Sequence, residues 1–80
     1  MTYEEAQQKI DSNSDIIGKL FRHRTNGSFE KIVKLYPKEI SSGKWIILVN
    51  LVPPKLEVSF IVNVFEPELD SFLRLYERWN

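Results

Sequence analysis

The chain has 80 residues, 11 Lys and Arg against 11 Asp and Glu, one histidine and no cysteine. This length accommodates one domain, residues 1–80, with a small hydrophobic core, and the hydrophobic fraction of 42% indicates a folded chain. The lack of cysteine excludes disulfide scaffolds, cysteine-based zinc sites and thiol catalysis, and the balanced charge argues against a uniformly basic nucleic-acid binder.

The first predicted element is a helix over about residues 3–11. Thr2 followed by Glu5 has the pattern of a capping box, in which a hydroxyl and a carboxylate each accept a hydrogen bond from a backbone N–H at the helix start. The apolar positions that recur on one face of this helix are Tyr3, Ala6 and Ile10. Short polar residues over 11–15 should end it, because their side chains compete for backbone hydrogen bonds.

The middle of the chain is predicted to form four strands. Their expected ranges are 16–23, 29–36, 45–52 and 56–65. Asn26-Gly27 predicts a hairpin with a type I′ turn, since both residues accept positive φ angles, and Ser41-Ser42-Gly43 predicts the next turn. Pro37 should close the second strand, because proline cannot donate to a ladder. Connections this short favour antiparallel hairpins.

The last predicted element is a helix that begins at Glu66-Pro67-Glu68. Its apolar stripe consists of Leu69, Phe72, Leu73, Tyr76 and Trp79. The element order is therefore α-β-β-β-β-α. It predicts an α+β fold with a four-stranded antiparallel sheet and both terminal helices packed on one face. The alternative is a small SH3-like curled barrel flanked by helices.

Alternation along the third and fourth strands predicts two apolar faces, because side chains point to opposite sides with a period of two. Two helices on one face leave the other one semi-exposed, which on a soluble protein often marks an interface. The expected partner face consists of Tyr36, Ile46, Leu48, Ile61 and Phe65. It would bind another protein or, most simply, a second copy in a homodimer. A curled sheet, or one helix on each side, would instead bury both faces.

The net charge is zero, but basic and acidic residues are concentrated in different parts of the sequence. Residues 16–55 contain eight bases and two acids, whereas both terminal segments are net acidic. An anion or nucleic-acid patch is predicted near the Asn26-Gly27 turn, beside Phe21 and Phe29, since bases beside aromatic rings can hold phosphates and stack nucleobases. This patch consists of Lys19, Arg22, His23, Arg24 and Lys31. The alternative interpretation is that these bases protect exposed strands against edge-to-edge pairing.

The sequence predicts neither catalysis nor a cofactor. The single histidine, His23, lies between Arg22 and Arg24, with no adjoining carboxylate to orient it. A metal site is not expected either, because one histidine without cysteine is a poor ligand set. Trp45 is expected in the core, and Trp79 either in the last turn of the helix or in contact with a partner.

The expected function is therefore that of a small non-enzymatic module for protein binding or self-assembly. Nucleic-acid binding through the basic first hairpin is the alternative. The N-terminus, Met-Thr-Tyr-Glu-Glu, lacks the basic and apolar regions of a signal peptide, and no apolar run approaches the roughly 18 residues of a membrane span. A cytoplasmic location is expected.

Overall fold

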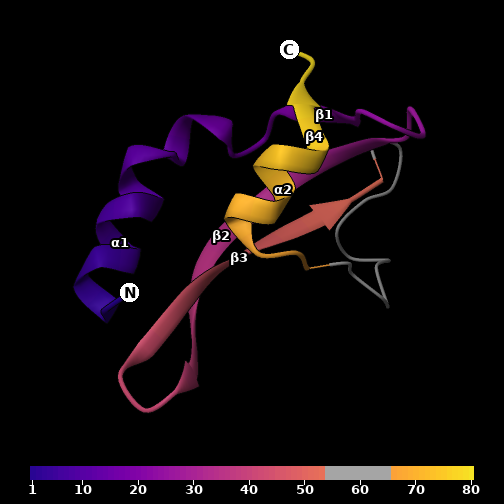
Figure 1. The fold of residues 1–80 in the computed structure, drawn as a ribbon. Coiled ribbons are helices and arrows are strands. Elements are labelled where there is room, and N and C mark those ends of the chain that lie inside the picture. The colour runs from indigo at the N-terminus through magenta and orange to yellow at the C-terminus, as the bar shows by residue number, and fades with distance from the viewer. Residues whose placement is uncertain (54–65) are drawn as a thin grey trace.

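A computed structural model describes residues 1–53 and 66–80 of the chain (Figure 1). Over these residues the fold is α+β, with two α-helices in contact with an open four-stranded antiparallel sheet, which confirms the predicted class. The elements are α1 (Tyr3–Ser12), the 3₁₀ turn η1 (Ser14–Ile16), β1 (Leu20–His23), β2 (Phe29–Ser41), β3 (Lys44–Val52), α2 (Leu69–Leu75) and β4 (Tyr76–Arg78). The strands lie in the order β3-β2-β1-β4.

The predicted first helix and its capping box are confirmed. The Thr2 hydroxyl accepts a hydrogen bond from the Glu5 backbone N–H at 3.2 Å, and the Glu5 carboxylate accepts one from the Thr2 N–H at 2.9 Å. The Thr2 backbone N–H, with a smaller contribution from the Thr2 hydroxyl, favours the charged carboxylate and holds the pKa of Glu5 below its usual value. A helix of ten residues is not stable alone in water, so the burial of Ala6 and Ile10 against the sheet is needed.

The predicted strand over 16–23 is correct only in its second half. Residues 14–16 form η1, and the chain then passes through Gly18, whose φ of +84° is a conformation that other residues rarely adopt. β1 therefore begins at Leu20 and pairs with the start of β2.

The hairpin between β1 and β2 is confirmed, but the predicted type I′ turn is wrong. His23 donates its N–H to the Ser28 carbonyl at 2.7 Å, and Gly27 donates to the His23 carbonyl at 3.0 Å, so four residues form the loop. Gly27 alone in this loop has a positive φ, of +76°. Asn26 does not have a positive φ, and its side-chain Oδ1 accepts hydrogen bonds from the backbone N–H and the hydroxyl of Ser28.

The predicted end of the second strand at Tyr36 is also wrong, because β2 continues through Pro37. Pro37 lies opposite Ile47. Two residues further along β3, Val49 donates its backbone N–H away from β2, to the Pro67 carbonyl at 2.9 Å. Since donors alternate sides along a strand, Pro37 and Ile47 form a non-hydrogen-bonded pair. Pro37 therefore removes no donor from the β2–β3 ladder.

The C-terminal helix is shorter than predicted. The side chain of Glu68 caps α2 by accepting from the N–H groups of Asp70 and Ser71, at 3.2 and 3.3 Å. α2 ends at Leu75, and the next three residues form β4, which pairs with β1. The expected helical position of Trp79 is therefore wrong. The chain forms a strand here rather than a longer helix, because β4 satisfies backbone groups on the open edge of β1 that a continued helix would leave unpaired. The predicted strand over 56–65 falls outside the described residues.

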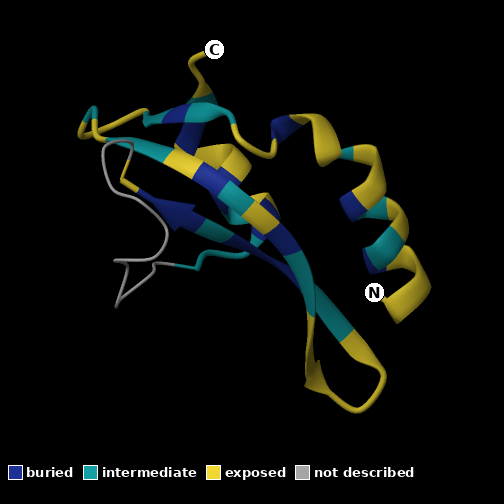
Figure 2. Cartoon of the chain, turned by 180° about the vertical axis from the view of Figure 1, so that it is seen from behind, coloured by how far each residue is buried: buried dark blue, intermediate teal, exposed yellow. Residues whose placement is uncertain are grey.

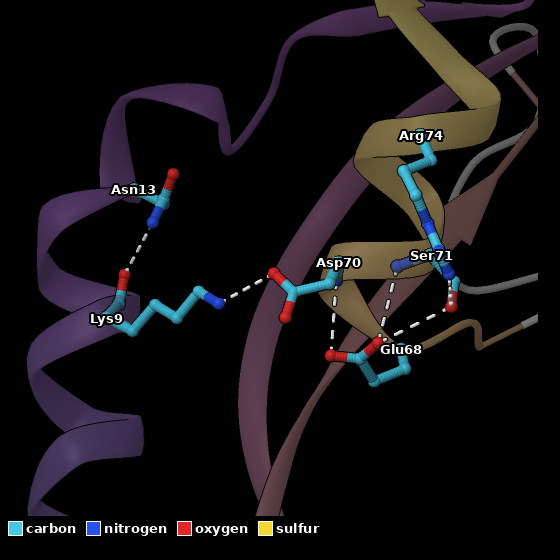
Figure 3. A network of polar contacts seen from close by, with 6 residues as sticks. All are labelled: Lys9, Asn13, Glu68, Asp70, Ser71 and Arg74. Carbon is cyan, nitrogen blue, oxygen red and sulfur yellow. Dashed lines mark hydrogen bonds and ion pairs between the residues drawn. The ribbon is translucent and has the colours of Figure 1, made fainter. Parts of the chain in front are cut away.

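Both helices pack on one face of the sheet and share one core, which we call the helix side. Its buried residues are Ala6, Ile10, Ile16, Phe21, Ile32, Leu35, Ile47, Val49, Leu51, Leu69, Phe72 and Tyr76. Lys9 of α1 forms an ion pair of 2.6 Å with Asp70 of α2 beside this core (Figure 3). We call the opposite face the reverse face. Seen from that side, β2 crosses in front of α2, and no helix of the described chain covers it (Figure 2).

Candidate functional site

Three side chains from different segments meet on the reverse face at the start of β2. The rings of Phe29 and Trp79 lie edge to face with their centroids 5.3 Å apart. The Arg22 guanidinium carbon lies 5.8 Å from the centre of the Trp79 ring, which is within the range of a cation–π contact. We call these three residues the aromatic–arginine cluster. Trp79 keeps 56% of its surface exposed although it belongs to this cluster.

A carboxylate orients the arginine of this cluster. Glu77 of β4 lies opposite Arg22 of β1, and its carboxylate is 3.3 Å from the Arg22 guanidinium and 3.8 Å from that of Arg24. All three side chains are more than a third exposed, so these ion pairs contribute little to folding stability. Their effect is positional, because Glu77 holds Arg22 beside the indole of Trp79.

Three lysines continue from this cluster along β2. Lys31, Lys34 and Lys38 are all exposed, and they lie opposite Val52, Asn50 and Ile46 of β3. An irregularity between Ile32 and Lys34 adds one residue to β2, so that Lys31 and Lys34 share the reverse face although they are three residues apart. We call the three lysines the lysine stripe. At the rise of an extended strand it spans about 20 Å.

The predicted basic patch is divided by the fold. Arg22 and Lys31 lie on the reverse face, and Arg24 is exposed directly after β1. His23 lies on the helix side, with its ring 4.9 Å from that of Tyr76. Lys19 precedes β1 and is half-buried.

His23 supports the hairpin turn rather than the basic surface. Its Nδ1 accepts hydrogen bonds from the backbone N–H groups of Thr25 and Asn26, at 3.1 and 3.2 Å. These contacts satisfy two donors of the four-residue loop, so His23 has a structural role that its basic neighbours in the sequence concealed.

The predicted partner face is partly covered within one chain. Leu48 keeps only 9% of its surface exposed, whereas Tyr36 and Ile46 are half-buried. The other two residues of this prediction, Ile61 and Phe65, lie outside the described residues. The described part of this face therefore leaves two partly exposed side chains rather than an open apolar surface.

Tyr36 is also held by a polar contact. Its hydroxyl donates a hydrogen bond to Glu66, whose carboxylate also accepts a bond of 3.4 Å from Asn50. The bond to Glu66 stabilises the neutral phenol and raises the pKa of Tyr36, with smaller contributions from burial and from the charge of Glu66. Lys34 lies with its ammonium nitrogen 5.0 Å from the centre of the Tyr36 ring, so the tyrosine also connects to the lysine stripe.

The described residues show no metal centre. Over residues 1–53 and 66–80, no group of three or more His, Asp or Glu side chains is arranged to hold a metal ion. In the same part of the chain, neither helix has the length and apolar character needed to cross a membrane.

Sequence reasoning missed part of the reverse-face surface. Of the two phenylalanines expected near the patch, Phe29 belongs to it and Phe21 is buried in the core. Lys34 and Lys38 lie in the basic segment 16–55, but the predicted patch does not include them. Period-two alternation along β2 was the signal that would have placed Lys38 beside Tyr36, whereas Lys31 and Lys34 share a face only because of the bulge.

Comparisons of this chain with protein-family models, with curated proteins and with solved structures find no match.

Proposed function

We propose that this chain is a non-enzymatic binding module that binds nucleic acid through the reverse face of its sheet. The observation that supports this proposal most strongly is the continuity of the lysine stripe with the aromatic–arginine cluster. Exposed cations that follow a strand can neutralise successive phosphates, and exposed aromatic rings beside them can stack bases. The same surface offers no comparable set of acids, since Glu77 and Glu66 are its acidic side chains among the described residues.

The zero net charge does not oppose this proposal, because the fold separates the charges. The described acids of the two helices are Glu4, Glu5, Asp11 and Asp70. They belong to the elements that cover the helix side. A phosphate chain on the reverse face would therefore experience mainly the nearby lysines and arginines.

The proposal is tested by removing two positive charges from each side of the sheet. The first variant is Lys31→Ala/Lys34→Ala on the stripe, and the matched control is Lys9→Ala/Arg74→Ala on the helices. Both lose the same net charge. Binding of a fluorescently labelled single strand is measured by anisotropy over a salt series that starts at about 50 mM.

The stripe variant should bind more weakly and lose about 1.4 from the slope of log affinity against log salt, at ~0.7 per phosphate contact on a single strand. The helix variant should keep the slope of the unmodified protein. The proposal fails if the unmodified protein does not bind at the lowest salt concentration, or if the two variants change the slope equally.

Self-association is the second candidate, and the partial exposure of Ile46 beside Tyr36 favours it. A two-fold dimer could cover both side chains. Sedimentation at about 100 μM should then show a dimer that Ile46→Asp dissociates, whereas a strict monomer at this concentration would exclude a dimer of useful affinity.

A further inference from the structure

We infer that the aromatic–arginine cluster stacks an unpaired base, so that the ligand of the reverse face is single-stranded nucleic acid rather than a duplex. This inference rests on the proposed function and adds a class of ligand to it. The lysine stripe alone would bind any polyanion of suitable shape. The exposed indole of Trp79, held between a second aromatic ring and a guanidinium, adds a preference for free bases.

The apolar indole ring of Trp79 is left largely in water, which is unfavourable. Trp79 is 56% exposed, whereas Trp45 packs against the core and lies edge to face with Tyr3 at 5.0 Å. Trp45 therefore contributes to the core, whereas Trp79 remains on the surface. A large exposed ring contributes little to folding and much to binding.

The exposed ring of Trp79 is held in a restricted position. Phe29 contacts Trp79 at an interplanar angle of 78°, and Arg22, itself paired with Glu77, lies beside the indole. The backbone N–H of Trp79 donates to the Leu20 carbonyl at 2.9 Å, which fixes the residue against β1. A ring that is already ordered loses less conformational entropy when a base stacks on it.

The cluster and the lysine stripe follow one another along a single strand. The cluster lies at the first residue of β2, and the lysine stripe runs from there toward the far end of the strand. A single strand laid along β2 can place one base on Trp79 and its following phosphates near Lys31 and Lys34. A duplex keeps the faces of its bases stacked inside the helix, so it can use the lysines but not the indole.

The test uses the Trp45→Phe protein, in which Trp79 is the single tryptophan and an aromatic side chain remains at the position that contacts Tyr3. Three ligands of equal length, about eight nucleotides, are compared: a thymidine strand, the same backbone without bases, and a duplex. The thymidine strand should quench Trp79 and bind more tightly than the abasic backbone. Equal affinity of these two ligands would overturn the inference.

Trp79→Ala separates this inference from the proposed function. The loss of one stacked base should weaken binding of the thymidine strand about 5- to 150-fold, with affinity for the duplex and the abasic backbone unchanged. Trp79→Phe, which keeps an aromatic face, should restore most of the affinity. Circular dichroism checks that each variant folds.

The outcomes are distinguishable. If Trp79→Ala leaves the affinity for the thymidine strand unchanged while Lys31→Ala/Lys34→Ala still weakens it, base stacking is wrong and nucleic-acid binding stands. If none of the three ligands binds, both proposals fail. An acidic peptide that quenches Trp79 as strongly as the thymidine strand at the same concentration would contradict a nucleic-acid ligand and indicate a protein partner.

Discussion

The two faces of the sheet use similar residues in different ways. On the helix side, the rings of Phe72 and Tyr76 stack at 4.5 Å and are almost fully buried. On the reverse face, the rings of Phe29 and Trp79 are 5.3 Å apart, and Trp79 is exposed. The buried pair is stacked, with 23° between its ring planes, whereas the reverse-face pair lies edge to face at 78°. Aromatic pairs serve stability where water is excluded and are available for binding where it is not.

Phe72→Ala should give the largest effect. Phe72 is fully buried between α2 and the sheet, and its ring lies 5.0 Å from that of Phe21. Removal of a buried phenylalanine costs roughly 3–5 kcal/mol, a large part of the ~4–12 kcal/mol expected for a domain of this size. Urea unfolding measures the loss. The matched change Trp79→Ala should cost less than about 1 kcal/mol. Equal losses would contradict the division between the two faces.

Thr2→Ala should reduce stability by about 1 kcal/mol, because it removes the side-chain cap of α1 on the helix side. Thr2→Ser keeps the hydroxyl and serves as the control. The folded-state pKa of Glu5 is lowered by the backbone and the hydroxyl of Thr2, so its contribution is present above the unfolded pKa and is lost as the pH falls through the folded pKa. Thr2→Ala keeps the backbone N–H, so only the part of the difference that comes from the effect of the hydroxyl on Glu5 should be lost in acid. A difference that grows in acid would show that the capping box is not formed.

Tyr36→Phe should reduce stability at neutral pH by about 1 kcal/mol, through loss of the hydrogen bond to Glu66. The pKa of Tyr36 is raised by this bond, so the contribution is present below the unfolded pKa and is lost as the pH rises through the folded pKa. Unfolding at pH 7 and at about pH 11 should show a smaller difference at the higher pH. Such a loss would show that Tyr36 is a reverse-face residue with a structural role.

Glu30→Gln should give the smallest effect, a gain in stability of about 0.5 kcal/mol or less at neutral pH. Glu30 lies opposite Phe21, and burial raises its pKa, so the charged carboxylate is disfavoured in the folded chain. The raised pKa makes ionisation destabilising above the unfolded pKa, and this penalty is absent in acid, where the residue is protonated. The gain should therefore vanish near pH 3. A loss of stability at neutral pH would show that the Glu30 charge is favourably paired.

The fold was predictable where sequence period and turn chemistry agreed. The capping box of Thr2 and Glu5, the hairpin at Gly27 and the core face of alternate residues along β3 all depend on neighbours in the sequence, and each is present. The continuation of β2 through Pro37 was not predictable, because it depends on the direction in which the opposite residue of β3 donates.

The candidate site was less predictable for the same reason. The sequence after Leu75 is compatible with a continued amphipathic helix and with a short strand. Pairing with β1 determines that it forms a strand. That pairing brings Trp79 into contact with Phe29, although the two residues are 50 positions apart in the sequence. Lys31 and Lys34 share a face because of a bulge that has no local signal in the sequence.

The two tryptophans allow the central claim to be tested in one experiment, since each reports on one side of the sheet. The indole N–H groups of Trp45 and Trp79 give separate signals in a ¹⁵N-labelled protein, and a short single strand is titrated into it at low salt. The account predicts that the Trp79 signal shifts with the concentration of the strand while that of Trp45 stays in place. A shift of the Trp45 signal alone, or no shift of either signal, would contradict it.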